Sequence, residues 1–378
     1  MWMLSGYIHV QSVQASAWES PAETHRRELP RQLRSKRSRP RHNGSTSSWM
    51  IGCTSHLHRS QSVRAGSGGH GDHPKLILVT GAGGRVGSVG TKLVAMLTAS
   101  GFAVRAQVRR LDERSEALAR LGAEVVVADF TRMDDTMRAV QGCSRVFFCL
   151  SVSDVYLEAA LNIAAAARHH GVEVFVNLSQ MTVSQMSITN ITSATTSKQQ
   201  RYHWLVEQVL AWSGLPVVEV RATLFLEHSF FRIMAAKSIR KSGELRLPFG
   251  TAKISPVAAM DVTRVAFEVI SDPQRHLGKV YEVVGPESLD GDGIAAQYSK
   301  ALGREVKYVD VPMEEWIQTD LAEHHFSDHL HDHFVILAAK TVKGDNDRMG
   351  DDVELVTGVK ALTIEEWVRQ NIYFFTVE

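Results

Sequence analysis

From Lys75 onward, apolar positions alternate between short β-branched runs and longer stretches with helical periodicity. The first run, 76–79 (LILV), is too short and too β-branched for a helix and predicts a buried strand of a parallel sheet. Further strands are predicted at 103–108, 124–127, 145–149, 173–178 and 216–221, with helices at 86–100, 113–121, 133–140, 156–170 and 198–212 between them. Strands and helices interleaved at this spacing predict right-handed crossovers and a doubly wound parallel sheet of the α/β class.

After residue 221 the apolar pattern becomes less regular, and the predicted elements are of mixed type. Helices are predicted at 224–240, 259–271 and 289–302, short strands at 244–249, 279–284 and 306–311, and a last helix from Ile364. Thr363 and Glu366 give that last helix a capping box. We therefore expect a sheet domain at 75–223 and, at 224–378, mainly a smaller α/β substrate lobe over the strand ends.

Residues 1–74 differ in composition from the rest of the chain. Basic side chains crowd one part of this segment, at Arg26, Arg27, Arg31, Arg34, Lys36, Arg37, Arg39 and Arg41, and serines, glycines and histidines follow. Such a segment buries too little apolar surface to fold alone, so we predict a disordered basic segment of minor function. Three origins stay open: an organellar transit peptide, a basic tail that contacts anions, or an upstream extension of the reading frame. Glu19, Glu23 and Glu28 weaken the transit-peptide interpretation.

Glycines follow the first predicted strand at once, in the sequence TGAGGRVG at 80–87. A strand, a glycine turn and a helix in this order form a dinucleotide-binding site, because glycines let the backbone approach a pyrophosphate at the helix N-terminus. An ordinary tight turn is the alternative, and the flanking strand and helix make it the weaker one. The predicted binding residues of this Rossmann-type loop are Gly81, Gly84, Arg85, Val86 and Gly87.

The end of the second predicted strand indicates which dinucleotide binds. A site for NAD usually has an acidic residue there, about 20 residues after the glycines, to bind the ribose 2′-hydroxyl. Here Arg109 stands 22 residues after Gly87, and its guanidinium, with that of Arg85, suits a 2′-phosphate. Solvated loop charges are the alternative. We predict NADP(H) as the preferred cofactor, with NAD(H) also accepted, and Asp129 as a ligand of the adenine amino group. Ser151 follows the fourth strand, where open α/β sheets bind ligands.

Composition excludes several other classes of protein. The 378 residues are 44% hydrophobic and 22% charged, which is ordinary for a globular enzyme. A net charge of +1 gives no general attraction to nucleic acid or anionic membranes, and no apolar run reaches the ~18–20 residues of a membrane span. Cys53, Cys143 and Cys149 are too few for a disulfide framework. We expect a cytoplasmic protein, or an organellar one if residues 1–74 are a transit peptide.

Residues 75–375 resemble the NmrA-like group of atypical short-chain dehydrogenase/reductases, which includes quinone reductases and azoreductases. The resemblance rests on TGAGGRVG, Arg109, ADF at 128–130, YHWLVEQVLAWSGLPVVEVRATLFLEH at 202–228 and ISPVAAMDV at 254–262. It implies a Rossmann fold that binds NADP(H). It also implies that Phe225 packs near the nicotinamide and that Ser179, after the fifth strand, is the family's serine.

The chain departs from typical short-chain dehydrogenases at their catalytic Tyr-x-x-x-Lys pair. By register, Gln199 stands at the tyrosine position and His203 at the lysine position, while Tyr202 points in another direction. Reduction of an unactivated ketone needs a strong proton donor, whereas a quinone accepts hydride readily. We therefore predict His203 and Ser179 as catalytic residues, with His203 orienting the substrate or supplying a proton. A polar surface residue is the alternative for His203.

A histidine-rich segment is the last feature of the sequence that could carry chemistry. The segment AEHHFSDHLHDHF at 322–334 places His325, His329 and His333 four residues apart, a spacing that can chelate a metal. We expect no metal there, since the family group needs none, and the cluster could instead line the substrate entrance.

The leading functional hypothesis is an NADPH-dependent oxidoreductase that reduces a quinone-like or azo acceptor. The alternatives are a non-catalytic NADP(H)-sensing regulator that signals to a protein partner, and an isomerase or reductase of a specialised metabolite. The expected partner is a small-molecule acceptor, without nucleic acid or membrane, and a homodimer stays open.

Overall fold

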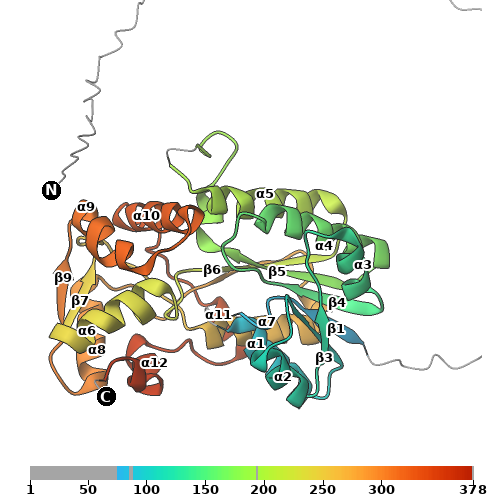
Figure 1. The fold of residues 1–378 in the computed structure, drawn as a ribbon, viewed down its shortest axis with the longest axis horizontal. Coiled ribbons are helices and arrows are strands. Elements are labelled where there is room, and N and C mark those ends of the chain that lie inside the picture. The colour runs from blue at the N-terminus through green and yellow to red at the C-terminus, as the bar shows by residue number, and fades with distance from the viewer. Residues whose placement is uncertain (1–74, 85–87, 193–194, 377–378) are drawn as a thin grey trace, which may run out of the picture. The chain divides into compact units, whose positions relative to one another are not determined.

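The centre of the fold is a parallel sheet of seven strands (Figure 1). The computed structural model describes residues 75–84, 88–192 and 195–376, which all lie in one unit, Gly69–Glu378. The strands are β1 (Leu76–Val79), β2 (Val104–Val108), β3 (Glu124–Val127), β4 (Cys143–Phe148), β5 (Val174–Gln180), β6 (Val217–Ala222) and β8 (Val280–Val283). Their order is β3-β2-β1-β4-β5-β6-β8, and every pair is parallel. The direction of winding reverses between β1 and β4, which is where such sheets bind ligands.

Helices cover both faces of the sheet, as Figure 1 shows. One face packs on α1 (Val89–Ala99), α2 (Glu113–Arg120), α7 (Ala259–Ser271) and α11 (Asp352–Thr357), and the other on α3 (Met133–Val140), α4 (Tyr156–His170) and α5 (Lys198–Ser213). Because both faces are covered, Ile77, Leu78 and Val79 are all fully buried, which explains the uninterrupted apolar run in the sequence. The predicted doubly wound α/β sheet is confirmed.

A smaller lobe stands at the carboxyl ends of the strands and has its own core. Its strands β7 (Glu244–Leu247) and β9 (Lys307–Asp310) pair in parallel. Its helices are α6 (Ala236–Ser242), α8 (Gly291–Leu302), α9 (Met313–Trp316), α10 (Asp328–Val342) and α12 (Ile364–Gln370). Trp316, Trp367 and Phe230 fill its core, and the capping box of Thr363 and Glu366 is present. The boundary at residue 223 stays a prediction, and α7 and β8 return from beyond it to the main sheet.

The segment 224–240 is not a single helix, so that prediction was wrong for its first part. Phe225 pairs with Val257 in a parallel bridge, and the Leu226 N–H donates to the Val257 carbonyl at 2.9 Å. A π-helical turn, Phe230–Ala235, then leads into α6. This long-range pairing outweighs the local helical pattern. It extends the chain just after β6, beside the carboxyl end of the sheet.

Candidate functional site

The glycine loop after β1 lies in close contact with the end of β4. Gly81 has a φ of 62°, and a Cβ atom there would lie 2.5 Å from the Cys149 carbonyl oxygen. On α1, a Cβ atom at Gly90 would lie 2.8 Å from the Gly81 carbonyl oxygen. The loop and α1 therefore approach each other as closely as a pyrophosphate-binding turn requires. Gly84 belongs to this loop, while the predicted residues Arg85, Val86 and Gly87 lie outside the described part.

Two side chains from β2 and α2 hold the glycine loop from outside. Gln107 accepts the Gly81 N–H at 3.3 Å and donates to the Ala128 carbonyl at 2.7 Å. Arg114 donates to the Gly83 carbonyl at 2.7 Å. Sequence reasoning missed Arg114, although the N-cap at Asp112 signals it by placing residue 114 in the first turn of α2.

The remaining predicted residues on this side of the site are exposed. Arg109 is exposed at the end of β2 and forms no ion pair within the described part of the chain. Asp129 accepts hydrogen bonds from the backbone and hydroxyl of Thr131, at 3.0 and 2.8 Å. Its carboxylate therefore already stabilises a local turn. A role for either residue in binding stays a prediction.

A cavity of about 240 Å³ lies at the carboxyl ends of β4, β5 and β6, between the sheet and the lobe. It brings together four predicted site residues from distant segments, namely Ser151, Ser179, His203 and Phe225. The wall of the cavity also includes Cys149, Leu178, Thr223, His228, Leu330, His333, Phe334 and Leu337. Parallel strands end at one edge of the sheet, so these segments converge there.

His203 is buried on α5 and paired with a tyrosine from α4. Its Nδ1 atom lies 2.9 Å from the hydroxyl oxygen of Tyr156, which is fully buried. Burial lowers the pKa of His203 to about 3, so the imidazole is neutral near pH 7. Tyr202, next to His203 in the sequence, stacks on His329 instead and does not line the cavity. Sequence reasoning missed Tyr156, because nothing local connects α4 with α5.

Ser179 is connected to a buried ion pair. Its hydroxyl donates to Glu207 at 2.5 Å, and Glu207 pairs with Arg221 of β6 at 2.6 Å. Because the Ser179 hydroxyl already donates its hydrogen bond to Glu207, it can accept a hydrogen bond from a ligand but cannot donate one. Glu219 lies on β6, as Arg221 does. Burial and the negative charge of Glu207 raise the pKa of Glu219.

His228 and His333 also line the cavity. Sequence reasoning missed His228 and placed His333 only in a cluster that could line the substrate entrance. Half-buried His228 follows β6, and burial lowers its pKa to about 4. His333 comes from α10, and burial, together with the other histidines nearby, lowers its pKa to about 3. The signal for His333 was its place in the histidine-rich segment.

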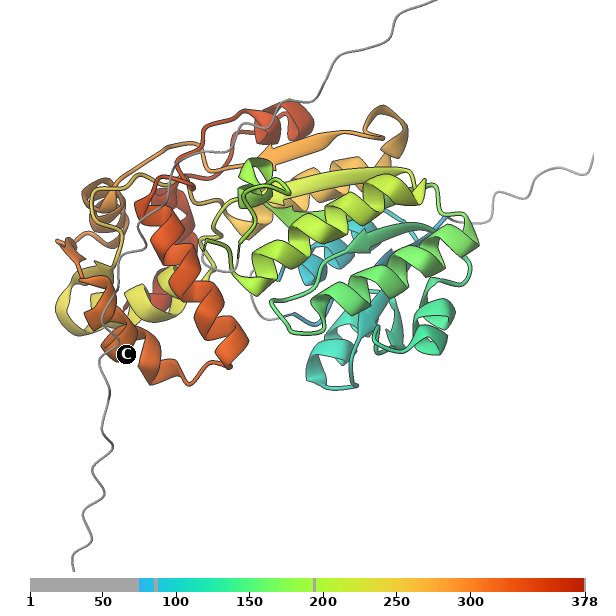
Figure 2. The ribbon, with the colours of Figure 1, turned by 90° about the horizontal axis from the view of Figure 1, so that it is seen from above.

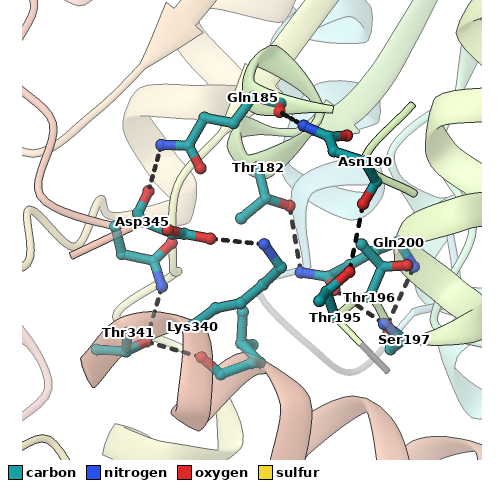
Figure 3. A network of polar contacts seen from close by, with 12 residues as sticks. Thr182, Gln185, Asn190, Thr195, Thr196, Ser197, Gln200, Lys340, Thr341 and Asp345 are labelled. Atoms are coloured by element: carbon teal, nitrogen blue, oxygen red, sulfur yellow. Dashed lines mark hydrogen bonds and ion pairs between the residues drawn. The ribbon is translucent and has the colours of Figure 1, made fainter. Parts of the chain in front are cut away.

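Helix α10 lines the cavity, and its N-terminal half is bound to the sheet domain. Near its start, His333 Nδ1 lies 2.8 Å from the Ser197 hydroxyl, and His329 reaches Asp154 at 2.9 Å. Near its end, Lys340 pairs with Asp345 at 2.5 Å, as Figure 3 shows. Figure 2 shows α10 beside α5. The contacts near its start hold α10 in place as the lobe-side wall of the cavity.

Neither a metal site nor a membrane span is found in the described part of the chain. No group of three or more His, Cys, Asp or Glu among residues 75–84, 88–192 and 195–376 is arranged to hold a metal ion. Over the same residues, no helix is long and apolar enough to cross a membrane.

Neutral, buried His333 makes folding stability depend on pH. The unfolded chain binds a proton near pH 6.5, whereas the folded chain does so only near pH 3, so stability falls as the pH drops between these values. From about pH 7.5 to about pH 5, we expect wild type to lose about 2 kcal/mol more unfolding free energy than His333→Gln. Urea unfolding of both proteins at the two pH values measures this difference, and parallel losses would contradict it.

A glycine loop at the switch point and a cavity at the strand ends define a nucleotide-binding protein of the Rossmann type. The chain belongs to the NmrA-like family, whose model matches residues 73–368.

Several characterised proteins resemble the chain over nearly their whole length. It is 28% identical over 305 residues to an NAD(P)H azoreductase of Xenophilus azovorans, covering 79% of this chain and 99% of the relative. It is also 28% identical over 305 residues to a (4-alkanoyl-5-oxo-2,5-dihydrofuran-3-yl)methyl phosphate reductase of Streptomyces griseus, covering 80% of this chain and 100% of the relative. An NADPH-dependent quinone oxidoreductase of Escherichia coli, solved with NADPH, superposes with a TM-score of 0.67 at 22% identity, covering 79% of this chain and 99% of that one.

Proposed function

We propose that the protein is an NAD(P)H-dependent oxidoreductase that prefers NADPH and reduces a quinone-like or azo acceptor. The observation that carries this proposal is the cavity at the strand ends, next to the glycine loop, with neutral His203 in its wall. The NAD(P)H azoreductase and the NADPH-dependent quinone oxidoreductase support it, because the chain matches each over 99% of its length. A small-molecule acceptor is the expected partner.

The residues present fit a dinucleotide. The close approach at Gly81 and Gly90 leaves the loop backbone open to a pyrophosphate. Arg109 and Arg114 would hold a 2′-phosphate. Ser151, Ser179 and Phe225 would surround the nicotinamide end. Because its hydroxyl already donates to Glu207, Ser179 would accept a hydrogen bond from the N–H of the nicotinamide carboxamide.

His203 assists the reduction as a hydrogen-bond donor. Bound NADPH supplies hydride, and a quinone that gains it together with one proton from water becomes the hydroquinone. If the Tyr156 hydroxyl donates to Nδ1, the imidazole proton is on Nε2, where it can stabilise the oxygen that gains negative charge. Gln199 and His203 stand where typical short-chain dehydrogenases have Tyr and Lys, so no tyrosine–lysine proton donor acts here. This suits an acceptor whose reduced form is only weakly basic.

Replacing His203 should slow quinone reduction without weakening dinucleotide binding. We expect His203→Ala to lower kcat/KM for a quinone about 100-fold, because a donor to the developing charge is lost. Tyr156→Phe should lower it about tenfold, since Nδ1 loses its partner and the tautomer is no longer fixed. Steady-state oxidation of NADPH with a quinone panel gives both values.

The pH profile and a binding measurement serve as controls. With a pKa of about 3, His203 should produce no inflection in kcat/KM near pH 6.5. A loss that appears only as weaker NADPH binding would contradict the proposed role of His203. If the protein binds NADPH but none of the acceptors tested makes it oxidise NADPH, the sensing regulator becomes the better description.

A further inference from the structure

The cavity wall carries no ionised side chain. Among the described residues that line it, none is Asp, Glu, Lys or Arg. Behind Ser179, Glu207 of α5 and Arg221 of β6 form an ion pair at 2.6 Å, so their charges offset each other. A charged ligand group brought into this cavity would lose its hydration without gaining an opposite charge, which costs several kcal/mol.

Two lobe histidines supply neutral hydrogen-bond donors instead. His228 Nδ1 accepts the Phe230 N–H at 3.3 Å, so the single proton of the neutral ring is on Nε2. The Ser197 hydroxyl accepts the Gln200 N–H at 3.1 Å and lies 2.8 Å from His333 Nδ1. If this hydroxyl donates to Nδ1, the proton of the neutral His333 ring is on Nε2 as well.

The surroundings of these donors are aromatic and aliphatic. The Phe334 ring lies 4.9 Å from the His228 ring and 6.2 Å from the His333 ring, between centroids. Leu330 and Leu337 of α10 complete this wall. On the opposite side, the Thr223 hydroxyl is buried and has no hydrogen-bond partner among the described residues. The cavity thus combines apolar surface with a few uncharged polar groups.

We propose that this cavity selects uncharged aromatic acceptors, whose oxygen atoms bind the Nε2–H groups of His228 and His333. The proposal rests on the oxidoreductase function proposed above and adds the charge of the substrate. It distinguishes the substrate of this chain from that of the relative whose name gives a dihydrofuranylmethyl phosphate as substrate. The described part of the cavity wall has no cation that would bind a phosphate.

A matched pair of acceptors tests the proposal. We expect kcat/KM for ortho-naphthoquinone to exceed that for ortho-naphthoquinone sulfonate at least 100-fold, although the sulfonate withdraws electrons and makes the ring the stronger oxidant. His228→Gln and His333→Gln should each lower kcat/KM for the neutral quinone about tenfold, mainly through KM. Equal rates with both acceptors, or a preference for the sulfonate, would overturn the proposal and leave the oxidoreductase function intact.

A variant that adds charge provides the complementary test. Leu330→Arg should raise kcat/KM for the sulfonated quinone at least tenfold, whereas Leu330→Gln should not. Calorimetric binding of both quinones to the NADP⁺ complex tests the charge preference even without turnover. NADPH binding with no acceptor reduced would refute the proposed function. In that case, equal affinity for the two quinones would refute the charge preference as well.

Discussion

Replacing Glu207 with Gln should lower the free energy of unfolding by about 3–5 kcal/mol, because it leaves Arg221 buried without its charged partner. Glu207 is 5% exposed and Arg221 19% exposed in their side chains. The carboxylate also accepts the Ser179 hydroxyl and two contacts from the Arg221 Nε atom, each at 3.2 Å. Urea unfolding at neutral pH measures the loss.

Two comparisons show whether the loss comes from the unpaired charge. Glu116→Gln breaks an exposed pair with Arg120 on α2 and should change stability by no measurable amount. Adding Arg221→Met to Glu207→Gln removes the orphaned charge and should restore most of the lost stability. A small loss in the single variant would mean that Glu219, 8% exposed on the same strand, replaces Glu207 as the partner of Arg221.

The sequence could predict the sheet because strand and helix signals there are local. The run at 76–79 matches β1, and the stretches 133–140 and 156–170 match α3 and α4 in full. The predicted helix at 224–240 failed at its start, because the bridge of Phe225 to Val257 depends on residues far along the chain. Local periodicity carries no information about such pairs.

The candidate site was predictable only in part, for the same reason. Residues at or just beyond the carboxyl end of a strand, such as Ser179 in β5 and Ser151 after β4, can be placed at the sheet edge from their position alone. Tyr156 and His333 lie in helices, and only the packing of α4 and α10 brings Tyr156 to His203 and His333 to the cavity. The histidine-rich pattern has a spacing that can chelate a metal, although we expected none there. In the structure, His329 and His333 join α10 to the start of α5.

Removing both arginines beside the glycine loop should shift cofactor preference strongly. We expect Arg109→Ala with Arg114→Ala to lower kcat/KM for NADPH about 100- to 1,000-fold, while the value for NADH changes only a few-fold. The 2′-phosphate is the only group that separates the two cofactors. Guanidinium groups bind it through charge-assisted hydrogen bonds, which are stronger than neutral ones. Steady-state kinetics with both cofactors and one quinone give the ratio.

The ratio of the two cofactors, rather than either rate alone, decides this prediction. Arg114 also donates to the Gly83 carbonyl at 2.7 Å, so its loss disturbs the loop for NADPH and NADH alike. Arg120→Ala, on the same helix and exposed, keeps that contact and should leave the ratio unchanged. Arg109→Glu should go further and favour NADH, because a carboxylate repels the phosphate and can bind a ribose hydroxyl. If the ratio stays at its wild-type value both in the double variant and in Arg109→Glu, the 2′-phosphate binds away from β2.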